Sequence, residues 1–69
     1  MMRKIESLRI DKGVTAEEMA KDFGVTVKTI YNWQDNQRAL TGEKIIKICK
    51  YFGITANDFL GIDIKEKVG

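Results

Sequence analysis

Residues 16–35, with the sequence AEEMAKDFGVTVKTIYNWQD, are the stretch that decides the fold of this chain. Apolar residues recur there at helical spacing on both sides of a short break at Gly24. The small side chain of Ala20 lets two helices approach closely, and Gly24 supplies the turn between them. Ile30 and Trp33, three residues apart, place the second helix on a core. Residues 16–35 therefore predict two short helices that cross around a tight turn.

Glycine and threonine residues mark helix ends and helix starts along the rest of the chain. The chain contains no proline, and no alternation of apolar and polar residues is long enough for a convincing strand. The predicted helix ends carry residues that tolerate a left-handed backbone: Gly13, Gly24, Asn36, Gly53 and Gly61. The predicted helix starts carry threonine N-caps: Thr15, Thr26, Thr41 and Thr55. We therefore expect five helices, over residues 2–12, 16–23, 27–35, 42–52 and 56–60.

The apolar positions of these segments define the expected core. Helical spacing selects the following residues for it: Leu8, Met19, Ala20, Phe23, Ile30, Trp33, Ile45, Cys49, Phe52 and Leu60. Thr15 and Glu18 have the spacing of a capping box, and Ile54 precedes the Thr55 cap, where a hydrophobic staple belongs. We expect Met1 to Arg3 to be frayed.

The composition restricts the chemistry that the chain can perform. A length of 69 residues allows one domain, expected over residues 1–69 with its core at 5–61 and a C-terminal tail at 62–69. One cysteine and no histidine exclude an intrachain disulfide and argue against a zinc site or histidine-based catalysis. We therefore expect no cofactor, no metal and no enzymatic activity.

Hydropathy and charge restrict the location and the partners. The apolar runs are too short for a transmembrane segment, and a lone cysteine suits a reducing compartment, so we expect a cytoplasmic protein that does not bind membranes. The formal net charge is +2. Any binding of nucleic acid must therefore come from a few well-placed cations and not from a strong overall field.

The whole pattern resembles the phage-repressor and Cro-type (XRE) family of helix-turn-helix DNA-binding proteins. The resemblance covers residues 5–61 in register, and its pieces are residues 5–9, 13–20, 23–26, 29–33, 41–55 and 59–61. It implies an all-α, compact, five-helix fold of the lambda-repressor type. In that fold the helix over residues 27–35 is the recognition helix.

The chain departs from the family pattern at several positions. Ala16 replaces the glutamine that usually follows the second N-cap and meets the DNA backbone. Arg9 matches an arginine that the family pairs with a glutamate, but Gln34 stands in place of that glutamate, so we expect Arg9 to be freer to reach a phosphate. Asn36 and Leu40 replace a glycine and a proline.

The resemblance implies that the recognition helix enters the major groove of double-stranded DNA. Lys28 can donate to guanine and Asn32 can pair with adenine, while the methyl groups of Val27 suit thymine. These residues are the expected base readers, with packing inside the domain as the alternative for Val27 and a plain surface role for Lys28 and Asn32. The expected backbone contacts are Arg9, Thr26, Thr29, Tyr31, Gln37, Arg38, Thr41 and Lys44, with half-buried packing as the alternative for Tyr31.

The resemblance also implies a function. The expected protein is a small Cro-like transcriptional repressor, of phage or prophage type, that covers an operator overlapping a promoter. The chain is equally compatible with the DNA-binding half of a longer repressor. A homodimer on a near-palindromic operator is expected, with an interface at Ile54, Ile62 and Ile64. The alternative for Ile62 and Ile64 is that they fold back onto their own chain.

A second class of function remains open from the sequence. Relatives of this fold also act as protein-interaction modules, such as antitoxins or regulatory adaptors. The nearly balanced charge and the acidic residues Glu17, Glu18 and Asp22 are compatible with that alternative.

Overall fold

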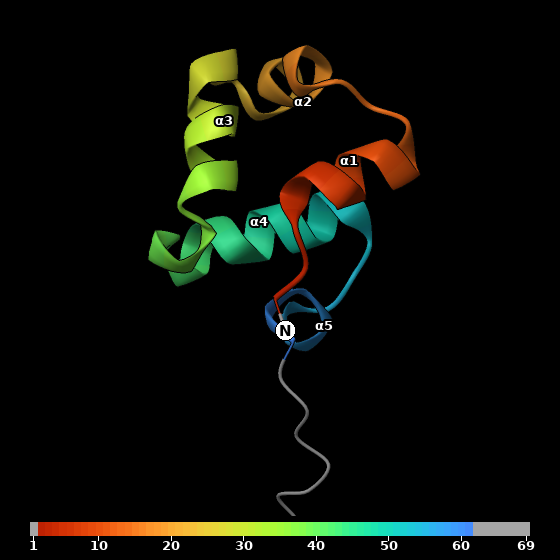
Figure 1. Ribbon diagram of the computed structural model, residues 1–69, viewed down its shortest axis with the longest axis vertical. Helices are drawn as coiled ribbons and strands as arrows, with labels where there is room; N and C mark the ends of the chain where they lie inside the picture. The colour runs from red at the N-terminus through yellow and green to blue at the C-terminus, as the bar shows by residue number, and fades with distance from the viewer. Residues whose placement is uncertain (1, 62–69) are drawn as a thin grey trace, which may run out of the picture.

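The computed structural model describes residues 2–61, which form five α-helices and no strand (Figure 1). The helices are α1 (Ile5–Lys12), α2 (Ala16–Phe23), α3 (Val27–Asp35), α4 (Gly42–Phe52) and α5 (Ala56–Leu60), with a short 3-10 helix, η1 (Gln37–Ala39), between α3 and α4. The predicted all-α class and the ranges of the last four helices are confirmed. No helix in this part of the chain is long and apolar enough to cross a membrane. The expected tail, 62–69, lies outside the described residues.

Threonine hydroxyls begin four of the five helices, as predicted. The Thr15 side chain accepts a hydrogen bond from the Glu18 backbone N–H, and the Glu18 carboxylate accepts one in return from the Thr15 N–H, at 3.0 and 2.8 Å. This reciprocal pair is the predicted capping box. Thr26, Thr41 and Thr55 cap α3, α4 and α5 in the simpler one-way form. Each cap satisfies an amide that the helix leaves unpaired and contributes about 1 kcal/mol.

The connections before α2, α3 and α5 repeat one three-residue pattern of glycine, an apolar residue and threonine. In the connection at 24–26, Gly24 has φ +71°, and the Val25 N–H donates to the Ala20 carbonyl at 2.9 Å. This arrangement ends one helix, turns the apolar side chain inward and starts the next helix. Ile54 holds the apolar position of the last such connection, so it packs partly against the core.

Three expectations about local backbone structure are wrong. The first helix begins at Ile5 and not at residue 2, because the preceding residues are extended and tied to α5. The Arg3 N–H donates to the Phe59 carbonyl at 2.8 Å, and the Arg3 guanidinium pairs with the Asp58 carboxylate at 2.9 Å, so Arg3 is not frayed. Asn36 has φ −129° and is not left-handed. The chain continues from it into η1, which makes a left-handed turn unnecessary.

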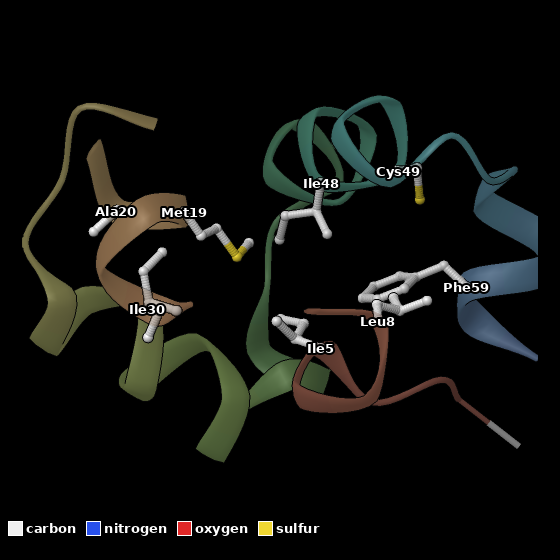
Figure 2. Packing of buried hydrophobic residues seen from close by; sticks show 9 residues of the cluster. Ile5, Leu8, Met19, Ala20, Ile30, Ile48, Cys49 and Phe59 are labelled. Atoms are coloured by element: carbon white, nitrogen blue, oxygen red, sulfur yellow. The ribbon is translucent and has the colours of Figure 1, made fainter. Parts of the chain in front are cut away.

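The core lies where α1, α2, α3, α4 and α5 converge (Figure 2). Its buried residues are Ile5, Leu8, Ala16, Met19, Ala20, Ile30, Ile48, Cys49 and Phe59. Figure 2 shows Phe59 reaching from α5 toward Leu8, with Cys49 of α4 above it.

The expected and observed cores differ mainly in which residues of each helix face the interior. Residues that were expected to be buried but are only partly buried pack around the rim: Phe23, Trp33, Ile45, Phe52 and Leu60. In α5 the buried side chain is Phe59 and not its neighbour Leu60. Helix α4 has too many apolar residues for all of them to share one face. Ile48 is the one that is fully buried, and Ile46 is left exposed.

Aromatic side chains close the rim between α2, α3 and α4. Phe23 meets Trp33 and Tyr51 edge-to-face, with ring centroids 5.5 and 4.9 Å apart. The Tyr51 hydroxyl donates to the Asp22 carboxylate at 2.7 Å, and the Lys12 ammonium lies 5.2 Å from the centre of the Tyr51 ring. Tyr51 of α4 therefore contacts side chains of both α1 and α2.

The environment of Tyr51 predicts a loss of stability at alkaline pH. Burial, the hydrogen bond to Asp22 and the charges of Asp22 and Glu18 raise the pKa of Tyr51 from 10.0 to about 12. Because this pKa is higher in the folded than in the unfolded chain, the neutral phenol stabilises the fold fully below pH 10, and that contribution is lost as the pH rises toward about 12. We expect Tyr51→Phe to remove this part of the pH dependence. Denaturant unfolding of both proteins across that range measures it, and parallel curves would contradict the expectation.

The crossing of α2 and α3 depends on a small residue. Ala20 is only 3 % exposed and lies in the cluster that holds Met19 and Ile30. Leucine at this position has no room, so we expect Ala20→Leu to lower the free energy of unfolding by roughly 1–3 kcal/mol. Lys21→Leu, at the neighbouring exposed position, is the control and should change stability little. Urea unfolding measures both, and wild-type stability of Ala20→Leu would show that the helices do not cross at Ala20.

Candidate nucleic-acid interface

Helices α2 and α3 form a helix-turn-helix whose second helix borders the domain. Figure 1 shows α3 along one edge, with its N-terminus beside α2 and its C-terminus near η1 and the start of α4. Ile30 is fully buried and Trp33 is partly buried, so these residues hold α3 against the core. The opposite side of α3 faces away from the rest of the domain and is open to a partner.

The open side of α3 carries Lys28, Tyr31, Asn32 and Asp35, all exposed as predicted. Lys28 and Asn32 are separated by one helical turn, so their side chains lie one above the other on the same face. Within residues 2–61 neither side chain has a hydrogen-bond or ion-pair partner. Their donors and acceptors are therefore free for a ligand. Tyr31 is 46 % exposed, so about half of its side chain is covered and the rest is open to a ligand.

Val27 differs from the other expected base readers. Its side chain is only partly exposed and packs against the core. This placement favours the alternative of packing inside the domain, and it follows from the position of Val27 as the first residue of α3 after the inward turn at Val25. Lys28 and Asn32 remain as the candidates for base reading.

Two threonines shape the N-terminus of α3. The Thr26 hydroxyl accepts a hydrogen bond from the Thr29 N–H at 3.2 Å, and the two hydroxyl oxygens are 3.0 Å apart. Only one of these hydroxyls can donate its hydrogen to the other. The second hydroxyl hydrogen is then free to point outward, next to the unpaired amides of the helix start, where a phosphate is favoured.

The segment between α3 and α4 completes the candidate surface. Arg38 in η1 is exposed, and its guanidinium has no hydrogen-bond or ion-pair partner in the described part of the chain. Lys44 is exposed one turn into α4, and its backbone N–H donates to the Thr41 hydroxyl at 3.3 Å. An open depression brings this segment together with the recognition helix; it is lined by Asn32, Trp33, Asn36, Ala39, Leu40, Thr41 and Lys44.

Arg9 and Gln37 have partners inside the domain, which revises their expected roles. The Arg9 Nε donates to the Gln34 side-chain oxygen at 2.9 Å, so Arg9 is less free to reach a phosphate than expected. The Gln37 side chain binds the backbone of residues 3 and 5 and is not free to meet a phosphate. The single sequence signal for this contact is that Lys4, unlike the residues before the other four α-helices, offers no side-chain cap.

The acidic residues of α2 also have structural roles. The Glu18 carboxylate belongs to the capping box, and the Asp22 carboxylate accepts a hydrogen bond from the Tyr51 hydroxyl. These contacts explain two of the three acidic residues without a protein partner.

Ala16, at the start of α2, is buried, so its side chain cannot take the place of the family glutamine.

The thiol of Cys49, the one cysteine of the chain, is not reactive in the folded domain. Cys49 is buried, and burial, with a smaller contribution from the charge of Asp58, raises the pKa of its thiol. A thiol that resists deprotonation is a poor nucleophile and a poor metal ligand. Among residues 2–61, no group of side chains has the composition of a metal site.

The chain matches a known protein family. The family model described as Cro/C1-type HTH DNA-binding domain matches residues 4–64. No curated protein and no solved structure matches the chain. The matched region includes every helix that the structure describes, from α1 to α5.

Proposed function

The chain belongs to the Cro/C1-type helix-turn-helix DNA-binding family, and from this premise we propose that it is a sequence-specific transcriptional repressor acting as a homodimer. Membership implies DNA binding, and a domain of this kind is typically non-catalytic. The observation that best supports sequence reading is the pair Lys28 and Asn32, exposed and without partners among the described residues, one turn apart on the open side of α3.

The two base readers have complementary chemistry. The Lys28 ammonium carries only donors and suits the O6 and N7 acceptors of guanine. The Asn32 amide carries a donor and an acceptor and matches the N7 and N6 groups of adenine. Because both side chains point from one helix face into one groove, they read neighbouring base pairs.

The phosphate contacts surround these two residues. Thr26 and Thr29 lie at the start of α3, and Arg38, Thr41 and Lys44 lie beyond its end, so the set can hold the backbone on both sides of the groove. Tyr31, exposed on the same face, contacts a phosphate through its hydroxyl. Arg9, held by Gln34, adds positive charge behind this surface and makes no direct contact in this proposal.

Dimerisation explains how a chain with a net charge of only +2 holds an operator. Two copies double the phosphate contacts, and a two-fold axis places two recognition helices about 34 Å apart on a near-palindrome. The proposed interface is Ile54 with Ile62 and Ile64. Ile54 packs partly on its own core, and Ile62 and Ile64 lie outside the described residues. Occlusion of a promoter by the bound dimer gives repression.

Sedimentation equilibrium with and without operator DNA tests the dimer. We expect two copies per full site, and we expect Ile62→Asp to abolish this stoichiometry. Ile10→Asp is the matched control, because Ile10 is 68 % exposed on α1 and outside the proposed interface. A wild type that stays monomeric and binds a half-site as tightly as the full site would refute the dimer. Loss of the dimer in Ile10→Asp alone would refute the interface.

A further inference from the structure

We propose that Gln37 is a positioning residue for DNA binding, which holds the segment carrying Arg38 against the start of α1. The inference rests on the proposed function, in which Arg38 contacts a phosphate. It concerns how the uncharged neighbour of Arg38 makes that contact possible.

The side-chain amide of Gln37 binds two backbone groups far away in the sequence. Its oxygen accepts a hydrogen bond from the Ile5 N–H at 2.8 Å. Its nitrogen donates to the Arg3 carbonyl oxygen at 2.7 Å. The amide therefore uses both its acceptor and its donor on one short stretch of backbone, and these two bonds fix the direction of the side chain.

The hydrogen bond from the Ile5 N–H to Gln37 replaces the side-chain cap that α1 lacks. Threonine hydroxyls cap α2, α3, α4 and α5, but Lys4 provides no side-chain cap for α1. The Ile5 N–H is one of the amides at the helix start that have no partner within the helix. Gln37 supplies the missing acceptor from a different part of the chain. Its loss leaves a partly buried amide unsatisfied at the start of α1.

The backbone at residues 3–5, to which Gln37 is bonded, has contacts of its own with the rest of the domain. The Arg3 N–H donates to the Phe59 carbonyl at 2.8 Å, and the Arg3 guanidinium pairs with Asp58 at 2.9 Å. Ile5 is fully buried in the core. Gln37 is thus attached to a part of the domain that is bonded and packed on its own account, formed by the start of α1 and by α5.

Besides Gln37, the segment that carries Arg38 is held mainly at its far end, where Leu40 packs partly against the core. Residues 37–39 form a single 3-10 turn, with backbone bonds from Ala39 to Asn36 and from Leu40 to Gln37 at 3.0 and 3.1 Å. Arg38 is exposed, and its long side chain loses rotamer freedom when it binds a phosphate. A backbone fixed in advance by Gln37 reduces the ordering that binding requires.

The test is a double-mutant cycle of Gln37→Met and Arg38→Ala, read by DNA titration over a range of salt concentrations. Methionine keeps the length of the side chain and removes both hydrogen bonds. We expect Gln37→Met to weaken binding several-fold and to flatten the salt slope by about one unit, as Arg38→Ala does, although it removes no charge. In the Gln37→Met background, Arg38→Ala should then have almost no further effect.

Two controls separate positioning from a loss of stability. Ile48→Val lowers stability in the core and should leave the salt slope unchanged when binding is measured well below the unfolding temperature. Hydrogen exchange at the Ile5 amide should accelerate in Gln37→Met while the amides of α3 stay protected, which shows that the variant is folded.

Three results would overturn the inference. An unchanged salt slope in Gln37→Met would mean that Gln37 does not act through a charged contact. Additive effects of the two substitutions would mean that Gln37 and Arg38 act independently. Unchanged exchange at Ile5 would mean that the bond to Gln37 is absent in solution. A wild type that binds no DNA at any salt concentration would instead refute the proposed function.

Discussion

Replacement of Phe59 with alanine is expected to lower the free energy of unfolding by about 3–5 kcal/mol. Phe59 is fully buried and is among the largest side chains in the core, where it reaches from α5 toward α1 and α4. A domain of this size has a total stability on the order of 5 kcal/mol. The Phe59→Ala protein should therefore be largely unfolded or close to its transition at 25 °C.

Leu60→Ala is the matched control for that experiment. Leu60 is the next residue of the same helix and is only partly buried, so its truncation should cost clearly less. Circular dichroism during urea unfolding measures both variants. If Leu60→Ala cost more than Phe59→Ala, α5 would pack with the opposite residue inward and the described core would be wrong.

Replacement of Asn32 with alanine is expected to weaken binding to the best DNA site by about 1–3 kcal/mol. Asn32 is exposed on the open side of α3, and its amide has no hydrogen-bond partner among residues 2–61. Loss of a bidentate base contact should also relax the preference at one base pair and leave the affinity for unrelated sequences unchanged. Lys28→Ala should act in the same way at a neighbouring base pair.

The chain offers matched controls for both substitutions. Asn57 is an exposed asparagine of α5, and Lys47 is an exposed lysine of α4, both outside the candidate surface. Asn57→Ala and Lys47→Ala should leave the selected base sequence unchanged. Titration against the best site and its single-base variants measures these effects. An Asn32→Ala protein that loses affinity equally for every sequence would show that Asn32 does not read a base.

The limits of the helices could be predicted because they depend on residues that are close together in the sequence. Gly24, Val25 and Thr26, for example, end one helix and begin the next within three residues. Most of the exposed face of α3 was equally predictable, since Ile30 and Trp33 on the core side fix the opposite side of a helix. Val27 is the exception, because it packs against the core and was expected to be exposed. Lys28 and Asn32 then follow from the helical period.

The features that were missed depend on contacts between distant residues. The five residues of α5 are too few to show whether Phe59 or Leu60 faces the core. The start of α1 carries no capping side chain of its own, and its partner Gln37 comes from more than thirty positions away. Arg9 has a similar dependence, because its bond to Gln34 forms only when α1 and α3 are packed together.

Equilibrium titration of the intact protein with two duplexes of equal base composition is the most direct test of the central claim, that α3 reads a DNA sequence. One duplex is selected by the protein from random DNA, and the other is a scrambled version of it. We expect affinity for both to fall linearly with salt on logarithmic axes, and we expect the selected duplex to bind about 10³-fold more tightly or better. Equal affinity for the two duplexes, or the absence of salt-dependent binding to either, would contradict the claim.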